Sequence, residues 1–185
     1  MLALVDELKG RGVVGRVNVV LSPVISTCEA RARLLQEDFA AAEVAAREAV
    51  ELDGTDVEAW RLVALATAAQ DRVDDAIAAI DRVVALAAGW AGGHFMRGMY
   101  LHRAGRTPEA ASAVARATAL APTDGDSWYN LACYRALLGE KPAALYALAA
   151  AIRIDPSNAA TARDDGDFAS LARDHDFAKL TRASA

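Results

Sequence analysis

Residues 125–158 read GDSWYNLACYRALLGEKPAALYALAAAIRIDPSN, and this stretch decides the fold because related copies precede it at a constant step of 34 residues. Moving back by that step gives AGGHFMRGMYLHRAGRTPEAASAVARATALAPTD (residues 91–124) and then VEAWRLVALATAAQDRVDDAIAAIDRVVALAAGW (residues 57–90). A weaker first copy covers residues 23–56. Internal repeats of this period are typical of stacked supersecondary units, which mostly make binding surfaces and rarely make active sites.

Small residues recur at fixed places in each copy, and they predict two closely packed helices per copy. The three small columns are Ala30, Ala64, Gly98 and Ala132; Ala42, Ala76, Ala110 and Ala144; and Ala49, Val83, Ala117 and Ala151. Two columns with larger apolar residues are expected to fill the remaining space: Ala46, Ile80, Val114 and Leu148, and Leu52, Leu86, Leu120 and Ile154. Gly105 and Gly139 mark the break between two helices, while Pro122 and Pro156 end a copy.

These columns resemble the pattern of the tetratricopeptide repeat family. The copy at 125–158 matches that pattern through Trp128, Leu131, Ala132, Gly139, Ala144, Leu148, Ala151 and Pro156. The first copy departs most from the pattern, with Ser26 in the Trp column and Glu29 in the Leu column. The resemblance implies an all-α fold, an α-solenoid of antiparallel helix pairs.

The expected organisation is an apolar N-terminal extension (residues 1–22), four repeats, and a C-terminal cap (residues 159–185). The repeats are expected at 23–56, 57–90, 91–124 and 125–158. We expect eight helices between about Ser22 and Ile154, because each repeat supplies two. One or two further short helices are expected in the cap.

Composition narrows the classes of function. The net charge of −5 and pI near 5.2 argue against a general nucleic-acid binder, which needs a clustered basic face. Cys28 and Cys133 lie in non-adjacent copies, so no disulfide is expected and a reducing compartment, the cytoplasm, is predicted. No apolar run reaches the roughly 18 residues that a membrane span needs.

The sequence offers no pattern for catalysis, for a metal site or for a cofactor. His94, His102 and His175 have no cysteine or carboxylate at a spacing typical of a metal site. The run Asp174-His175-Asp176 is interpreted as a solvated turn, because no nucleophile motif accompanies it. We therefore predict that the protein is not an enzyme.

A candidate binding surface follows from helical geometry. In each first helix the stripe opposite the small column faces outward, and in the family that this chain resembles these faces line a concave peptide-binding groove. The predicted groove residues are Arg31, Arg61, Leu65, Phe95, Met99, His102, Arg103, Tyr129 and Cys133. Aromatic and apolar side chains beside arginines favour a protein or peptide partner that carries acidic and apolar residues.

Two classes of function remain open at this stage. The first is an adaptor, scaffold or assembly factor that binds a partner in the groove. The second is a self-associating subunit whose groove is filled by its own terminus or by a second copy. The apolar run at residues 13–21 bears on this choice, because it is expected either to fold back over the array or to form a symmetric dimer. Phe168, Leu171, Phe177 and Leu180 suit a cap on the last repeat, with a docking motif as the alternative.

Overall fold

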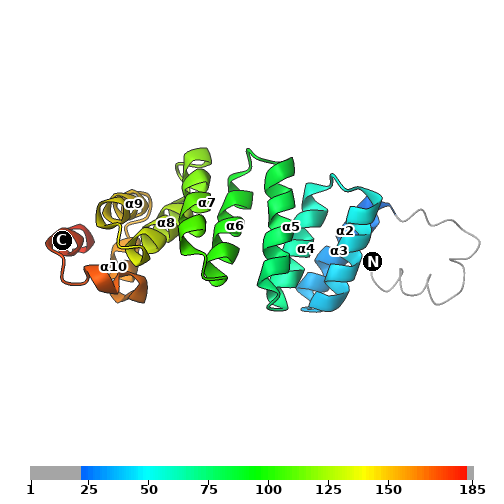
Figure 1. Cartoon of the computed structure of the whole chain (residues 1–185), viewed down its shortest axis with the longest axis horizontal. Coiled ribbons are helices and arrows are strands. Elements are labelled where there is room, and N and C mark those ends of the chain that lie inside the picture. The colour runs from blue at the N-terminus through cyan, green and yellow to red at the C-terminus, as the bar shows by residue number, and fades with distance from the viewer. Residues whose placement is uncertain (1–21, 183–185) are drawn as a thin grey trace, which may run out of the picture. The chain divides into compact units, whose positions relative to one another are not determined.

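The computed structural model describes residues 22–182, and its contacts divide the chain into two compact units, Met1–Leu86 and Ala87–Ala185 (Figure 1). Residues 22–182 contain helices and no strand, which confirms the all-α fold class. The apolar run at 13–21, and with it the choice between a folded-back segment and a dimer, lies outside the described residues.

From residue 22 onward, unit 1 is built from two helix pairs. Helix α2 (Pro23–Leu35) packs against α3 (Phe39–Leu52), and α4 (Val57–Ala69) packs against α5 (Val73–Leu86). The pairs are joined because α3 also packs against α4. Helix α2 starts at Pro23, next to the expected boundary at about Ser22, and the Ser22 side chain makes no capping hydrogen bond.

Unit 2 repeats this arrangement and adds the cap. Helix α6 (Ala91–Arg103) packs against α7 (Thr107–Leu120), which packs against α8 (Gly125–Leu137), and α8 packs against α9 (Lys141–Ile154). The cap consists of α10 (Asn158–Asp164), the 3-10 helix η2 (Gly166–Leu171) and α11 (His175–Thr181). It therefore contains three short helical segments, where one or two were expected.

The core is made by the small columns. Ala42, Ala76, Ala110 and Ala144 are fully buried, as are Ala49, Val83, Ala117 and Ala151. Gly98 shows how close the helices of unit 2 approach, because a Cβ on it would lie 2.3 Å from Cγ2 of Val114 on α7.

The prediction that the column of Leu52, Leu86, Leu120 and Ile154 fills the core is wrong. Leu52 and Leu86 are 48% and 37% exposed, because they end their helices, where fewer neighbours cover a side chain.

Two local features recur with the period of the sequence. The turn inside each pair contains a residue with positive φ, and these residues are Glu37, Asp71, Gly105 and Gly139. Only the last two copies place glycine there, which is the residue that tolerates this conformation best.

In the Trp column, Nε1 of Trp60 donates to the Gly54 carbonyl at 3.0 Å and Nε1 of Trp128 donates to the Pro122 carbonyl at 2.9 Å. Each of these hydrogen bonds ties the beginning of a first helix, α4 or α8, to the turn that precedes it.

Candidate functional site

In unit 1 the outward face of the first helices is a network of ion pairs. The Arg31 guanidinium lies 2.9 Å from the Glu58 carboxylate, and Nε of Arg61 lies 2.6 Å from the same carboxylate. The hydrogen bond from Arg61 holds the pKa of Glu58 below its usual value, and Arg31 adds to this effect. Both predicted groove arginines of unit 1 are therefore already engaged by one carboxylate. Leu65 lies on α4 and is half-buried.

In unit 2 the outward face of α6 has a different character. Phe95 is half-buried, Met99 is 45% exposed and Arg103 is exposed. His102 is engaged, since its ring stacks on that of Tyr134 with centroids 4.5 Å apart. Helix α6 contains two arginines and no carboxylate, so its exposed apolar side chain lies on a basic helix.

On α8 the equivalent positions, Tyr129 and Cys133, are covered by the cap. The Tyr129 hydroxyl donates to Oδ2 of Asp165 at 2.8 Å, and Sγ of Cys133 lies 3.7 Å from the same oxygen. Phe168 is 1% exposed and packs edge-on against Tyr129, with ring centroids 5.9 Å apart. The short segment from Asp165 to Phe168 therefore occupies the face of α8 that sequence analysis assigned to a groove.

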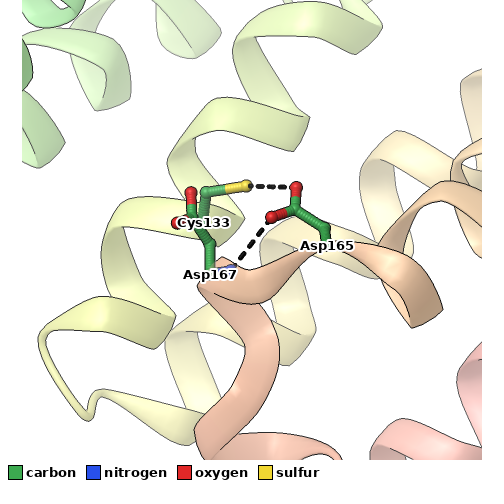
Figure 2. Close-up of side chains that lie close together, drawn as sticks. All are labelled: Cys133, Asp165 and Asp167. Carbon is green, nitrogen blue, oxygen red and sulfur yellow. Dashed lines mark hydrogen bonds between the residues drawn. The ribbon is translucent and has the colours of Figure 1, made fainter.

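The hydrogen bonds explain how this segment is held. Asp165 caps η2, because its Oδ1 accepts from the backbone N–H of Asp167 at 2.9 Å while its Oδ2 accepts from α8 (Figure 2). Burial raises the pKa of the Cys133 thiol, and the Asp165 and Asp167 carboxylates raise it further. Burial and the hydrogen bond to Asp165 likewise raise the pKa of Tyr129. Both groups therefore stay protonated and act as donors.

Cys133, Asp165 and Asp167 are also close enough together to be considered as metal ligands. Within residues 22–182 they form the one group of three or more His, Cys, Asp or Glu side chains with this property. One ligand atom from each of Cys133, Asp165 and Asp167 lies within 4.8 Å of the others (Figure 2). Asp165 is satisfied by donors of the protein itself, so the cluster is explained as the attachment of the cap.

The predicted groove residues thus fall into three local sets. Arg31, Arg61 and Leu65 lie in unit 1; Phe95, Met99, His102 and Arg103 lie on α6; and Tyr129 and Cys133 lie on α8 under the cap. Sequence reasoning missed Glu58 and Asp165 as the partners of these residues. The signal available for Asp165 was the acidic and aromatic run at residues 164–168, DDGDF, which begins at the last residue of α10.

The run Asp174-His175-Asp176 is the start of α11. Oδ1 of Asp174 accepts from the backbone N–H groups of Asp176 and Phe177, at 2.9 and 3.1 Å, and this carboxylate also forms an ion pair with Lys141. The His175 side chain is 87% exposed. These three residues begin and anchor a helix of the cap.

The architecture is that of an α-solenoid of helix pairs. The family model described as tetratricopeptide repeat matches residues 29–91 and 95–159, which is more than half of the chain. The chain therefore belongs to the tetratricopeptide repeat family, and repeats of this family generally serve protein interaction. No curated protein matches the chain significantly. No helix within residues 22–182 has the length and apolar character needed to cross a membrane.

Several solved structures share the fold. A crystal structure of MamA is 21% identical, with 82% of this chain and 90% of MamA covered at a TM-score of 0.72. YrrB, described as a TPR protein with an unusual peptide-binding site, is 16% identical, with 88% and 84% covered at 0.75. PilF of Pseudomonas aeruginosa is 17% identical, with 86% and 72% covered at 0.70. At these identities the comparison establishes the fold.

Proposed function

We propose that this protein is an adaptor, scaffold or assembly factor that binds a peptide or protein segment on the outward faces of its first helices. The observation that carries the proposal is Met99, a large apolar side chain that is 45% exposed at the centre of the α6 face. Exposed apolar side chains at such a position gain free energy when a partner covers them. The peptide-binding site named for YrrB, which shares the fold, supports the same class of function.

The partner that we propose carries apolar and acidic residues. Apolar side chains would pack against Phe95 and Met99, and a carboxylate would compete for Arg103, which already interacts within the chain, at the end of the same helix. In unit 1 a partner's carboxylate would compete with Glu58 for Arg31 and Arg61. Nucleic acid is not among the proposed partners, because the chain carries a net charge of −5.

Affinity purification from the native cell, followed by mass spectrometry, tests this proposal. The wild-type chain is compared with two variants. Met99→Glu places a carboxylate on the α6 face, and Leu52→Glu places one on α3, which is the second helix of its repeat and is not part of the proposed binding surface. Leu52 is a matched control because it is 48% exposed. We expect one set of partners to be lost with Met99→Glu alone. Retention of every partner by both variants contradicts the proposal.

A second candidate function is self-association, with the outward faces filled by the chain's own terminus or by a second copy. It is favoured by the segment from Asp165 to Phe168, because that segment already covers Tyr129 and Cys133 on α8. Light scattering over a dilution series separates the two candidates. A mass that falls from dimer to monomer on dilution supports self-association, and a constant monomer mass contradicts the dimer.

The cytoplasm is the compartment that we propose. Cys28 is exposed and Cys133 is buried, and both are free thiols. An exposed free thiol suits a reducing compartment, where thiols remain reduced. Cell fractionation with a labelled chain checks this location.

A further inference from the structure

A cleft of about 520 Å³ lies between α9 and α11 in unit 2. Helix α9 lines one wall with Leu145, Tyr146 and Ala149, and α11 lines the other with Asp176, Lys179 and Leu180. Side chains three or four positions apart lie on one face of a helix, so each wall is a single helical face. Two helical faces that converge in this way form a trough of the kind that receives another helix.

The repeat architecture explains why α9 is left uncovered. Within each unit a second helix packs against a complete first helix of the next copy, as α3 does on α4 in unit 1 and α7 on α8 in unit 2. After α9 the next helix, α10, has only 7 residues, whereas α4 and α8 have 13. The cap keeps the register, since α11 begins at His175, 34 residues after α9 begins at Lys141. It therefore acts as a shortened fifth repeat, and part of α9 lacks the helical cover that α3 and α7 have.

Tyr146 supplies an anchor in this trough. It is 70% exposed, yet its ring packs edge-on against Trp128 with centroids 5.9 Å apart (α8 and α9 in Figure 1). Trp128 is itself fixed by its hydrogen bond to the Pro122 carbonyl at 2.9 Å. A large aromatic side chain held in place costs little entropy when a partner packs on it, and such side chains are frequent centres of binding energy.

The charge on the α11 side of the cleft is positive. Asp176 also lines the cleft, and its carboxylate lies 3.5 Å from Nζ of Lys141, an ammonium that it shares with Asp174. With Lys179 and Arg182, the lining therefore carries two cations and one carboxylate. Lys179 and Arg182 are exposed and form no ion pair with any residue between 22 and 182. Two cations beside an apolar wall complement a ligand that has an apolar face flanked by carboxylates.

We propose that the cleft between α9 and α11 binds an acidic amphipathic helix of a partner protein. Apolar residues of that helix cover Leu145, Tyr146 and Leu180, and its carboxylates pair with Lys179 and Arg182. This surface uses other helices than the Met99 face of α6, so it stands independently of the function proposed above.

The test uses three labelled synthetic helices of 14 residues, the length of α9. All three share one apolar face of Leu and Ala, and they carry Glu, Gln or Lys at the remaining positions. Fluorescence anisotropy with the full chain measures the Kd of each. We expect the Glu helix to bind about tenfold or more tightly than the Lys helix, because the cleft wall is cationic. Tyr146→Ala and Lys179→Glu are each expected to raise the Kd of the Glu helix by about tenfold.

Two control variants keep the result specific. Arg116→Glu reverses an exposed charge on α7, and Met99→Ala truncates the α6 face. Both should leave the Kd of the Glu helix unchanged. The proposal is overturned if no helix binds, if the Glu and Lys helices bind equally, or if Arg116→Glu weakens binding as much as Lys179→Glu does. It is also overturned if light scattering shows a wild-type dimer that Tyr146→Ala disperses, since the occupant is then a second copy.

Discussion

The outward faces of α6 and α8 hold equivalent positions, yet one is open and the other is covered by the chain itself. Phe95 on α6 corresponds to Tyr129 on α8, and Met99 corresponds to Cys133, because the two residues in each correspondence are 34 positions apart. Met99 is 45% exposed, whereas Cys133 is 4% exposed beneath the cap. Equivalent backbone positions in a repeat array can therefore have opposite exposure.

The side chains account for this difference. Tyr129 and Cys133 each carry a donor, and both donors point at the Asp165 carboxylate. Phe95 and Met99 carry no such donor, so α6 could not hold Asp165 in the same way. On α8 the polar atoms therefore select the segment that covers the face, whereas the apolar periodicity that α6 and α8 share does not distinguish the two faces.

The largest expected effect comes from detaching the cap. Phe168→Ala removes a side chain that is 1% exposed and lies between Tyr129 and Phe177. We expect the free energy of unfolding to fall by about 3 kcal/mol or more, as for other buried Phe→Ala substitutions. Urea unfolding followed by circular dichroism measures the change, and Tyr129 should become more exposed. A loss below about 1 kcal/mol would mean that the cap contributes little and that the α8 face is open in solution.

The next effect tests the packing beneath the two faces. A Cβ on Gly98 of α6 would lie 2.3 Å from Cγ2 of Val114 and 3.2 Å from the Ala110 carbonyl, while its counterpart Ala132 on α8 is accommodated. Gly98→Ala should therefore destabilise unit 2 by about 1–3 kcal/mol through overpacking. Gly89→Ala is the control, because nothing lies within 4 Å of its added Cβ. Equal stability of the two variants would show that Val114 moves aside freely.

A pH effect is expected from the buried thiol on α8. Burial and Asp165 raise the pKa of Cys133 in the folded state above the value of about 8.5 for an unfolded thiol. Above pH 8.5 the unfolded chain loses this proton while the folded chain keeps it. The thiol's contribution to stability is therefore complete below that pH and is lost as the pH rises, by up to about 1.4 kcal/mol per pH unit.

Urea unfolding at several pH values between about 7 and 10 measures this slope. Cys133→Ala should flatten it, since the buried thiol is gone, whereas Cys28→Ala should leave it unchanged because Cys28 is exposed. A thiol reagent gives an independent check, with Cys28 reacting fast and Cys133 slowly. An identical slope in both variants contradicts this account of the α8 face.

Most of the fold follows from sequence periodicity. The first helices begin at Pro23, Val57, Ala91 and Gly125, and this constant step matches the one found in the sequence. Side chains with small volume repeat at the same step, and close packing leaves few alternatives for them. The periodicity mispredicts Leu52 and Leu86 as core residues, because both lie at the end of a helix, where neighbouring helices cover an apolar side chain only partly.

The character of the candidate site was harder to predict. Its residues were assigned from helical geometry, and their role in binding stays a prediction. The contact of Tyr129 with Asp165 could not be read from the repeats, because Asp165 lies outside them and faces α8 only after the chain bends between α10 and η2. Likewise Glu58 pairs with Arg31 from a different repeat, a contact that depends on side-chain conformation and not on periodicity.

The smallest expected change in stability belongs to the open face. Met99→Ala removes a side chain that is 45% exposed, so we expect a loss of about 0.5 kcal/mol or less, while the affinity for a partner segment of the α6 face falls about tenfold or more. Calorimetry with that segment, once it is mapped from the purified partner, measures the affinity. Leu52→Ala is the matched control, because Leu52 is 48% exposed on a second helix and should change neither quantity much. If Met99→Ala instead destabilises the chain as strongly as Phe168→Ala, the side chain belongs to the core, and the contrast between an open α6 and a covered α8 is wrong.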